Sequence, residues 1–305
     1  MIKRTLYFEN PAYLSLKNCQ LLVKIPEVEK NESLPDFFKA EEIRTFPIED
    51  IGVLVLDNKH ITITQGALEA LLENNTAVIT CDSSRIPVGL MLPLSGNTIQ
   101  NERFREQLNA SLPLKKQLWQ QTVQAKIANQ AAVLKECRTA EVRNMLKWIG
   151  EVRSDDIDNM EARAAAYYWA NLFKNFRRQR EGDPPNNLLN YGYAILRAIV
   201  ARSLVSSGLL PTLGIHHHNR YNAYCLADDI MEPYRPYVDK LVVNLFDGGK
   251  TELDKTTKSQ LLSIPVVDVI INGQRSPLMI SVSLTTSSLF KCFNAKSRKI
   301  LYPEM

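Results

Sequence analysis

Short apolar runs bounded by turn residues characterise the first 95 positions of the chain. They lie at residues 6–8, 13–16, 20–25, 51–56, 61–63, 77–80 and 87–92. Runs of this length, rich in β-branched residues, are typical of β-strands. Thr64 can cap one helix over residues 65–73, and the charged, proline-containing stretch 26–42 is typical of a long hairpin loop. The pattern therefore predicts a β-rich N-terminal domain.

From about residue 100 the apolar positions recur at helical spacing, beginning with Phe104, Leu108 and Leu112. We predict a helix over residues 156–178 and a buried helix over residues 188–205. Residues 290–305 contain four Lys and Arg and are predicted to form a basic tail. With a linker at residues 93–97, the predicted fold class is α+β multidomain. It has a β-rich domain at 1–95 followed by an all-α domain at 96–305.

The composition excludes several classes of protein. The 305 residues are 45% hydrophobic, as in a globular protein, but no run of about 18 apolar residues occurs, so no membrane span is predicted. Five scattered cysteines form no CxxC pair, which argues against a disulfide framework or a cysteine-rich zinc site and favours the cytoplasm. Neither a P-loop nor a dinucleotide-binding glycine motif is present, so nucleotide hydrolysis has little support.

Charge is distributed unevenly along the chain. Residues 1–95 hold 9 Lys and Arg against 13 Asp and Glu, a net of −4, whereas residues 96–305 hold 28 against 20, a net of +8. A basic second domain beside an acidic first one suggests that the second domain binds a polyanion such as a nucleic acid. The alternative is an ordinary solvated surface.

Glu161 stands in a stretch of small residues. In a helix it shares a face with Ala164, Ala165, Tyr168 and Leu172, which is mostly apolar. A carboxylate on such a face needs a partner, because burial of an unpaired charge is costly. Glu161 is therefore either a cation ligand or one half of a salt bridge to an arginine.

Two further elements carry groups that bind metals. Three of the four histidines are adjacent, at positions 216–218, and at most one or two of them can ligate one metal. Asp229 and Glu232 are three residues apart, so a helix places both on one face, with Cys225 one turn earlier. Asp228 points about 100° away and is predicted to be solvated, and Pro233 predicts a kink or helix end at Glu232. The alternatives are a polar surface loop and an acidic helix end.

Taken together, the three elements suggest the ligand set Glu161, His217 and Glu232, with Asp229 in support. Ligands that are mostly oxygen, with one imidazole, suit Mg²⁺ or Mn²⁺ better than structural zinc. Such a cation can activate a phosphodiester bond for displacement.

The chain resembles the CRISPR adaptation integrase family, the metal-dependent subunit that inserts new spacers into CRISPR arrays, and most closely its type II branch. The resemblance covers almost the whole chain. It depends on four motifs in order: NMEARAA at 159–165, LLNYGYAIL at 188–196, GL at 208–209 with GIHH at 214–217, and LADDIMEPYRPYVD at 226–239.

The resemblance implies that the family's metal ligands are Glu161, His217 and Glu232, with Asp229 as an acidic helper. Ala162 stands where many members have glycine. The implied fold is an N-terminal β domain used for dimerisation and a C-terminal helical domain that holds the site. The implied reaction is the attack of a DNA 3′-hydroxyl on a phosphodiester at the edge of a repeat.

The implied partners are double-stranded DNA, a second copy of the chain, and a small second adaptation subunit in a heterohexameric complex. Basic residues of the helical half would contact DNA phosphates, and the candidates are Arg177, Arg178, Arg180 and Arg235. Three alternatives stay open: a stand-alone structure-selective nuclease, a DNA-binding scaffold with an inactive site, and a phosphodiesterase for small molecules.

Overall fold

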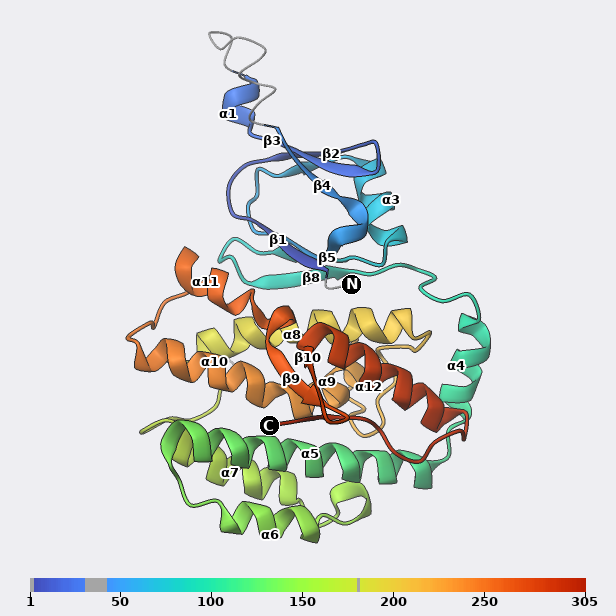
Figure 1. Cartoon of the computed structure of the whole chain (residues 1–305), viewed down its shortest axis with the longest axis vertical. Helices are drawn as coiled ribbons and strands as arrows, with labels where there is room; N and C mark the ends of the chain where they lie inside the picture. The colour runs from blue at the N-terminus through green and yellow to red at the C-terminus, as the bar shows by residue number, and fades with distance from the viewer. Residues whose placement is uncertain (1–2, 31–42, 180–181) are drawn as a thin grey trace. The chain divides into compact units, whose positions relative to one another are not determined.

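The computed structural model describes residues 3–30, 43–179 and 182–305 (Figure 1). The chain divides into two compact units, Met1–Gly96 and Asn97–Met305. The predicted hairpin loop at 26–42 falls largely outside the described residues, apart from the short helix α1, Pro26–Glu29.

In its described residues, the first unit contains two four-stranded sheets and one longer helix. One sheet has the order β1-β5-β7-β8, and the other has the order β4-β3-β2-β6. The strands are β1 Arg4–Phe8, β2 Tyr13–Lys17, β3 Gln20–Lys24, β4 Arg44–Pro47, β5 Ile51–Leu56, β6 Thr62–Ile63, β7 Ala77–Cys81 and β8 Pro87–Met91.

The helix α3, Gln65–Glu73, joins the two sheets of this unit in the chain and buries Ala67 and Leu71. The Thr64 side chain accepts a hydrogen bond from the Ala67 N–H, as the sequence predicted for the helix start. Leu14, Leu21 and Ile51 are almost fully buried beside Leu71, so both sheets share one apolar core.

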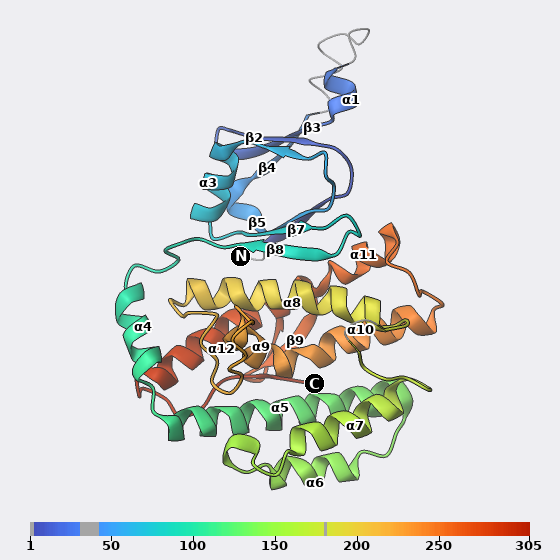
Figure 2. The ribbon, with the colours of Figure 1, turned by 180° about the vertical axis from the view of Figure 1, so that it is seen from behind.

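The second unit is mainly helical. Its helices are α4 Gln100–Asn109, α5 Leu112–Arg138, α6 Arg143–Glu151, α7 Met160–Leu172, α8 Asn186–Ser206, α9 Cys225–Met231, α10 Arg235–Asp247, α11 Lys255–Leu261 and α12 Leu278–Phe293. Figures 1 and 2 show α9 between α8 on one side and α5 on the other, and both helices contact it. This position of α9 brings its C-terminal end to α5.

The prediction of an all-α second domain is wrong in one respect. A three-stranded antiparallel sheet with the order β10-β9-β11 is formed by Asp268–Ile271, Gln274–Pro277 and Pro303–Glu304. Asn272 and Gly273 connect β9 to β10, and both have positive φ, 51° and 72°. An Asn-Gly pair with this backbone is a typical two-residue hairpin turn.

The predicted basic tail is also corrected. Helix α12 continues to Phe293, Ile300 and Tyr302 are buried, and β11 pairs with β9. The Tyr302 hydroxyl lies 2.8 Å from the Thr122 hydroxyl of α5. Residues 300–304 are therefore part of the folded unit.

Helix α7 is shorter than the predicted helix over 156–178. Asp155, Asp156 and Asn159 all have left-handed backbones, which delays the helix start to Met160. Phe173 is extended, so the helix ends at Leu172. Both ends are set by local backbone conformations that apolar spacing does not reveal.

Helix α8 is long and apolar enough to cross a membrane by length and composition. However, 78% of its most apolar window is buried inside the protein. Among the described residues no other helix meets the same test. The predicted buried helix over 188–205 corresponds to α8.

Candidate metal and catalytic site

The buried carboxylate of Asp229 organises the histidine loop. It is fully buried on α9 and accepts hydrogen bonds from the backbone N–H groups of Ile215 at 2.7 Å, His216 at 3.0 Å and His217 at 3.3 Å. A Cβ atom at Gly214 would lie only 2.4 Å from the His217 carbonyl oxygen. Only glycine therefore fits at the start of this tight loop.

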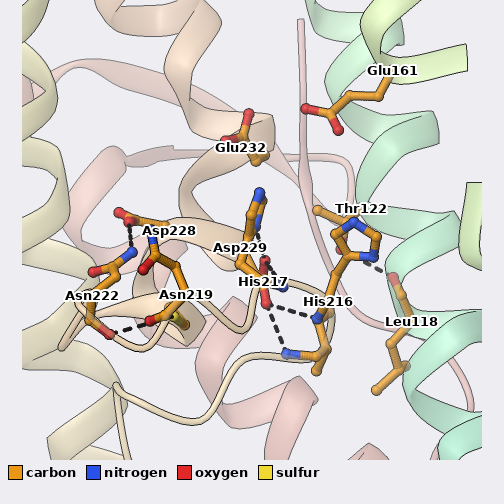
Figure 3. A network of polar contacts seen from close by, with 12 residues as sticks. Leu118, Thr122, Glu161, His216, His217, Asn219, Asn222, Asp228, Asp229 and Glu232 are labelled. Carbon is orange, nitrogen blue, oxygen red and sulfur yellow. Dashed lines mark hydrogen bonds and ion pairs between the residues drawn. The ribbon is translucent and has the colours of Figure 1, made fainter. Parts of the chain in front are cut away.

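His217 is oriented by the same carboxylate. Its Nδ1 lies 2.5 Å from Asp229 Oδ1, and Figure 3 shows the ring between Asp229 and Glu232. The hydrogen bond to Asp229 outweighs burial and raises the pKa of His217. With Nδ1 held in this way, the Nε2 atom is the one left for a ligand or for proton transfer.

Glu232 lies at the junction of α9 and α10. Helix α9 ends at Met231, and Glu232–Tyr234 form a 3₁₀ turn, as the proline at 233 predicted. The Glu232 carboxylate is 5% exposed and pairs with Arg235 at 3.1 Å. Burial alone would raise the pKa of Glu232, but Arg235 and Lys126 together lower it, so the carboxylate is ionised.

Glu161 is placed by an unusual helix start. The buried Asp156 carboxylate accepts hydrogen bonds from the N–H groups of Met160 and Glu161, both at 2.9 Å. This carboxylate satisfies two free N–H groups at the first turn of α7 and is also favoured by the helix dipole. The first turn then directs Glu161 toward α5, with its side chain 25% exposed.

Lys126 of α5 connects the two glutamates. Its Nζ lies 2.6 Å from Glu161 Oε1 and 2.6 Å from Glu232 Oε2. Burial alone would lower the pKa of Lys126, but Glu232 and Glu161 raise it above the usual value. The ammonium is therefore charged, and one cation bridges carboxylates from two different elements.

The structure thus brings Glu161, His217 and Glu232 together from three separate elements (Figure 3). Within residues 3–30, 43–179 and 182–305, no three His, Cys, Asp or Glu side chains are grouped closely enough to hold a metal ion as they stand. The Lys126 ammonium lies between the two carboxylates.

The donor set nevertheless fits a divalent cation. Glu232 Oε2 is buried, and within the described part of the chain no donor reaches it with good hydrogen-bond geometry, although the Lys126 ammonium is close. Two carboxylates and one imidazole suit Mg²⁺ or Mn²⁺. Asp229 is committed to the histidine loop, so its support for the site is indirect.

The other two histidines lie differently. The His216 ring stacks on Trp119 of α5, with 4.2 Å between the ring centroids, and its Nδ1 lies 3.5 Å from Asp155. His218 is exposed. Of the three adjacent histidines, His217 is therefore the one directed toward the glutamates.

Asp228 is not solvated as the sequence predicted. It is 8% exposed and accepts hydrogen bonds from Arg197 at 2.6 and 3.1 Å and from Asn222 at 2.7 Å. The prediction considered α9 alone, whereas α8 packs against the opposite face of α9 and provides Arg197.

The four arginines predicted to bind DNA have different surroundings. Arg177 is exposed, whereas Arg178 donates hydrogen bonds to Asn186 and Asn190 and lies over the Tyr193 ring. Arg235 pairs with Glu232 and also lies over Tyr193. Arg180 lies outside the described residues. DNA contacts by these residues stay predictions.

Three residues that support the site were not predicted from the sequence, namely Lys126, Asp156 and Trp119. Lys126 is the one with a visible signal. It falls on the stripe formed by Trp119, Val123, Gln130 and Val133, which has the spacing of the buried face of α5. A lysine in such a stripe predicts a buried acidic partner, because an unpaired ammonium would be costly there.

A second buried carboxylate lies behind the site. Asp239 of α10 accepts hydrogen bonds from Tyr168 of α7 and Tyr193 of α8. Burial raises the pKa of the Asp239 carboxyl from 3.8 to about 6, although both tyrosines and Arg235 oppose the shift. The folded protein therefore binds a proton between these pH values that the unfolded chain does not bind.

This shift predicts a pH dependence of stability. The contribution of Asp239 is full below pH 3.8 and is lost as pH rises through about 6. Between pH 5 and 7.5, Asp239→Asn should gain about 1 to 1.5 kcal/mol of unfolding free energy relative to the unsubstituted protein. Urea unfolding of both proteins at the two pH values measures the difference. A constant difference would contradict the raised pKa.

Comparisons with known proteins identify the family of the chain. The family model described as CRISPR associated protein Cas1 matches residues 6–264. The chain is 37% identical over 304 residues to the CRISPR-associated endonuclease Cas1 of Neisseria meningitidis serogroup C (strain 8013), which covers 99% of this chain and 95% of the relative.

Two solved structures share the fold. A casposase bound to integration product superposes with a TM-score of 0.77 at 20% identity, covering 98% of this chain and 92% of the casposase chain. A Cas6-RT-Cas1–Cas2 complex superposes with a TM-score of 0.71 at 19% identity, covering 98% of this chain and 36% of the other chain.

These matches define the class of protein as a CRISPR-associated one. The chain belongs to the Cas1 family, which confirms the family resemblance found in the sequence.

Proposed function

We propose that this protein is a DNA endonuclease and integrase that inserts spacer DNA into a CRISPR array by transesterification. Glu161, His217 and Glu232 would hold Mg²⁺ or Mn²⁺. The observation that supports the proposal is the arrangement of these three side chains, which come from α7, the histidine loop and the turn after α9.

The reaction exchanges one phosphodiester bond for another. A 3′-hydroxyl oxygen of the incoming DNA bonds to phosphorus, and the bond to the 3′-oxygen of the target strand breaks. A bound cation would stabilise the negative charge that develops on these oxygens. Because each phosphodiester lost is replaced by another, no nucleotide hydrolysis is needed.

His217 has two roles consistent with its surroundings. It is a metal ligand through Nε2, or it carries a proton there and gives it to the leaving oxygen. In both roles Asp229 fixes the ring through Nδ1. The pKa of His217 is raised, which favours a proton on Nε2 before the cation binds.

The proposed partners are double-stranded DNA, a second copy of this chain and a small second adaptation subunit in a heterohexamer. The casposase neighbour is bound to an integration product, and the other neighbour is a complex that contains Cas2. The net charge of +8 over residues 96–305 favours DNA binding by the second unit. The first unit would mediate dimerisation. The proposed location of the protein is the cytoplasm.

The second candidate is a stand-alone metal-dependent nuclease. The Neisseria relative is named an endonuclease, and side chains of Glu161 and His217 are 25% and 44% exposed. Water can therefore reach the open side of the site and act as the nucleophile in place of a DNA hydroxyl.

A branched DNA that mimics a half-integrated intermediate separates the two functions. With Mn²⁺, the unsubstituted protein should rejoin the target strand and release the branch, and Glu161→Gln should do neither. The measurement is the length of labelled strands on a denaturing gel. Lys147→Gln is a matched control, because Lys147 pairs with Glu151 on the exposed face of α6.

The products decide the outcome. Cleavage without rejoining would support the nuclease. Unchanged activity in Glu161→Gln would contradict the metal site. Absence of both products, even with the small second subunit added, would contradict the proposed activity and leave a DNA-binding scaffold.

A further inference from the structure

A protein cation stands between the two acidic residues of the proposed metal site. Lys126 lies on α5 with its side chain 10% exposed, and its Nζ contacts Glu161 and Glu232 at 2.6 Å each. The positive charge of Arg235 also acts on Lys126, but Arg235 pairs with Oε1, the other oxygen of Glu232. Lys126 is therefore the cation that joins the carboxylates.

The position of the ammonium is also the position that a small cation requires. Mg²⁺ bonds to carboxylate oxygens at about 2.0 to 2.1 Å, which is about 0.5 Å shorter than the two 2.6 Å contacts of Lys126. Two cations cannot share this position, because at such short distances their repulsion in a buried site is strong. Metal binding between these oxygens therefore requires the ammonium to leave.

The lysine side chain allows that movement. Its flexible four-carbon stem can carry the ammonium away while the helix stays in place. The side chain of Glu232 is only 5% exposed to solvent, whereas that of Glu161 is 25% exposed. The ammonium thus has an exit toward Glu161.

We propose that Lys126 occupies the cation position of the metal-free protein and that the divalent metal binds by displacing it. Lys126 is then a positioning residue that holds Glu161 and Glu232 facing each other before the metal arrives. The inference depends on the proposed function, because it takes these glutamates as the metal ligands.

Because Lys126 and the metal compete for one position, removing the lysine should strengthen Mn²⁺ binding. Simple loss of structure would weaken it. In Lys126→Met the two carboxylates have no ammonium between them, so Mn²⁺ should bind about tenfold more tightly or better. Removing the lysine should also lower the melting temperature in EDTA. Adding Mn²⁺ should then raise the melting temperature of the variant by more than it raises that of the unsubstituted protein. Calorimetric titration and electron paramagnetic resonance measure Mn²⁺ binding directly.

Two further variants complete the experiment. Lys126→Gln should also bind Mn²⁺ more tightly, and its amide keeps one hydrogen bond if Lys126→Met fails to fold without metal. Lys240→Met is the matched control. Lys240 pairs at 2.7 Å with Glu136, which lies on α5 but outside the proposed site. Its Mn²⁺ affinity should stay within about twofold of the unsubstituted protein.

The outcomes separate this inference from the proposed function. If the unsubstituted protein binds Mn²⁺ through Glu161 and both Lys126 variants bind it equally or more weakly, the displacement is wrong and the metal site stands. If neither the unsubstituted protein nor the Lys126 variants bind Mn²⁺ in a way that Glu161→Gln abolishes, both the metal site and the displacement are wrong.

Discussion

Replacing Glu232 with glutamine is expected to lower DNA strand transfer by about a thousandfold or more, because a neutral amide is a poor ligand for Mg²⁺ or Mn²⁺. Glutamine keeps the shape of glutamate and can still accept a hydrogen bond from Arg235, which contacts Glu232 at 3.1 Å. The rate on the branched DNA and the Mn²⁺ affinity measure the effect.

Glutamine is preferable to alanine at this position. Glu232→Ala would leave Arg235 without its carboxylate and Lys126 with only Glu161 in a buried site, at a cost of about 1 to 3 kcal/mol. A Glu232→Gln protein with an unchanged melting profile and full activity would exclude Glu232 from the metal site.

The second large effect is expected at Asp229, which contacts no proposed substrate. Its carboxylate accepts from three backbone N–H groups and from His217 Nδ1. In Asp229→Asn the amide NH₂ would face these donors, so the histidine loop should lose its conformation. We expect about 3 kcal/mol less stability and about a hundredfold less activity.

Asp228 provides the matched control for this change. It is the adjacent residue on α9 and is similarly buried, but it pairs with Arg197 and Asn222. Asp228→Asn should keep strand transfer within a few-fold of the unsubstituted protein. Equal losses of activity in both variants would show that general destabilisation of α9, and not loss of the loop, is responsible.

The three side chains that converge in the candidate site could be predicted from the sequence, whereas some of the residues that support them could not. The spacing of Asp229 and Glu232 and the adjacent histidines identified the elements, and the resemblance to the family selected His217. Lys126 was missed because a charged residue in a 27-residue helix is ordinary unless the buried face is known. Asp156 was missed because a left-handed backbone precedes α7.

Some elements of the fold could likewise be predicted from the sequence, and others could not. Runs of apolar residues predicted most strands of the first unit and the buried helix α8, because burial alone produces those patterns. The sheet of the second unit was missed although Asn272-Gly273 is a strong hairpin signal. Its strand β11 has only two residues and pairs with a strand more than thirty residues earlier, and such pairing has no local signature.

The path of the last residues links distant parts of the sequence. The Asn129 amide of α5 donates to the carbonyl groups of Pro233 and Pro303 at 2.8 and 3.0 Å, and its oxygen accepts from the Met305 N–H. Pro233 directly follows Glu232. Proteolytic removal of residues 303–305 would take away two hydrogen-bond partners of Asn129, the side chain that holds the carbonyl group of Pro233 beside the proposed metal ligand Glu232. Strand transfer would then be sensitive to the loss of a segment about seventy residues away in the sequence.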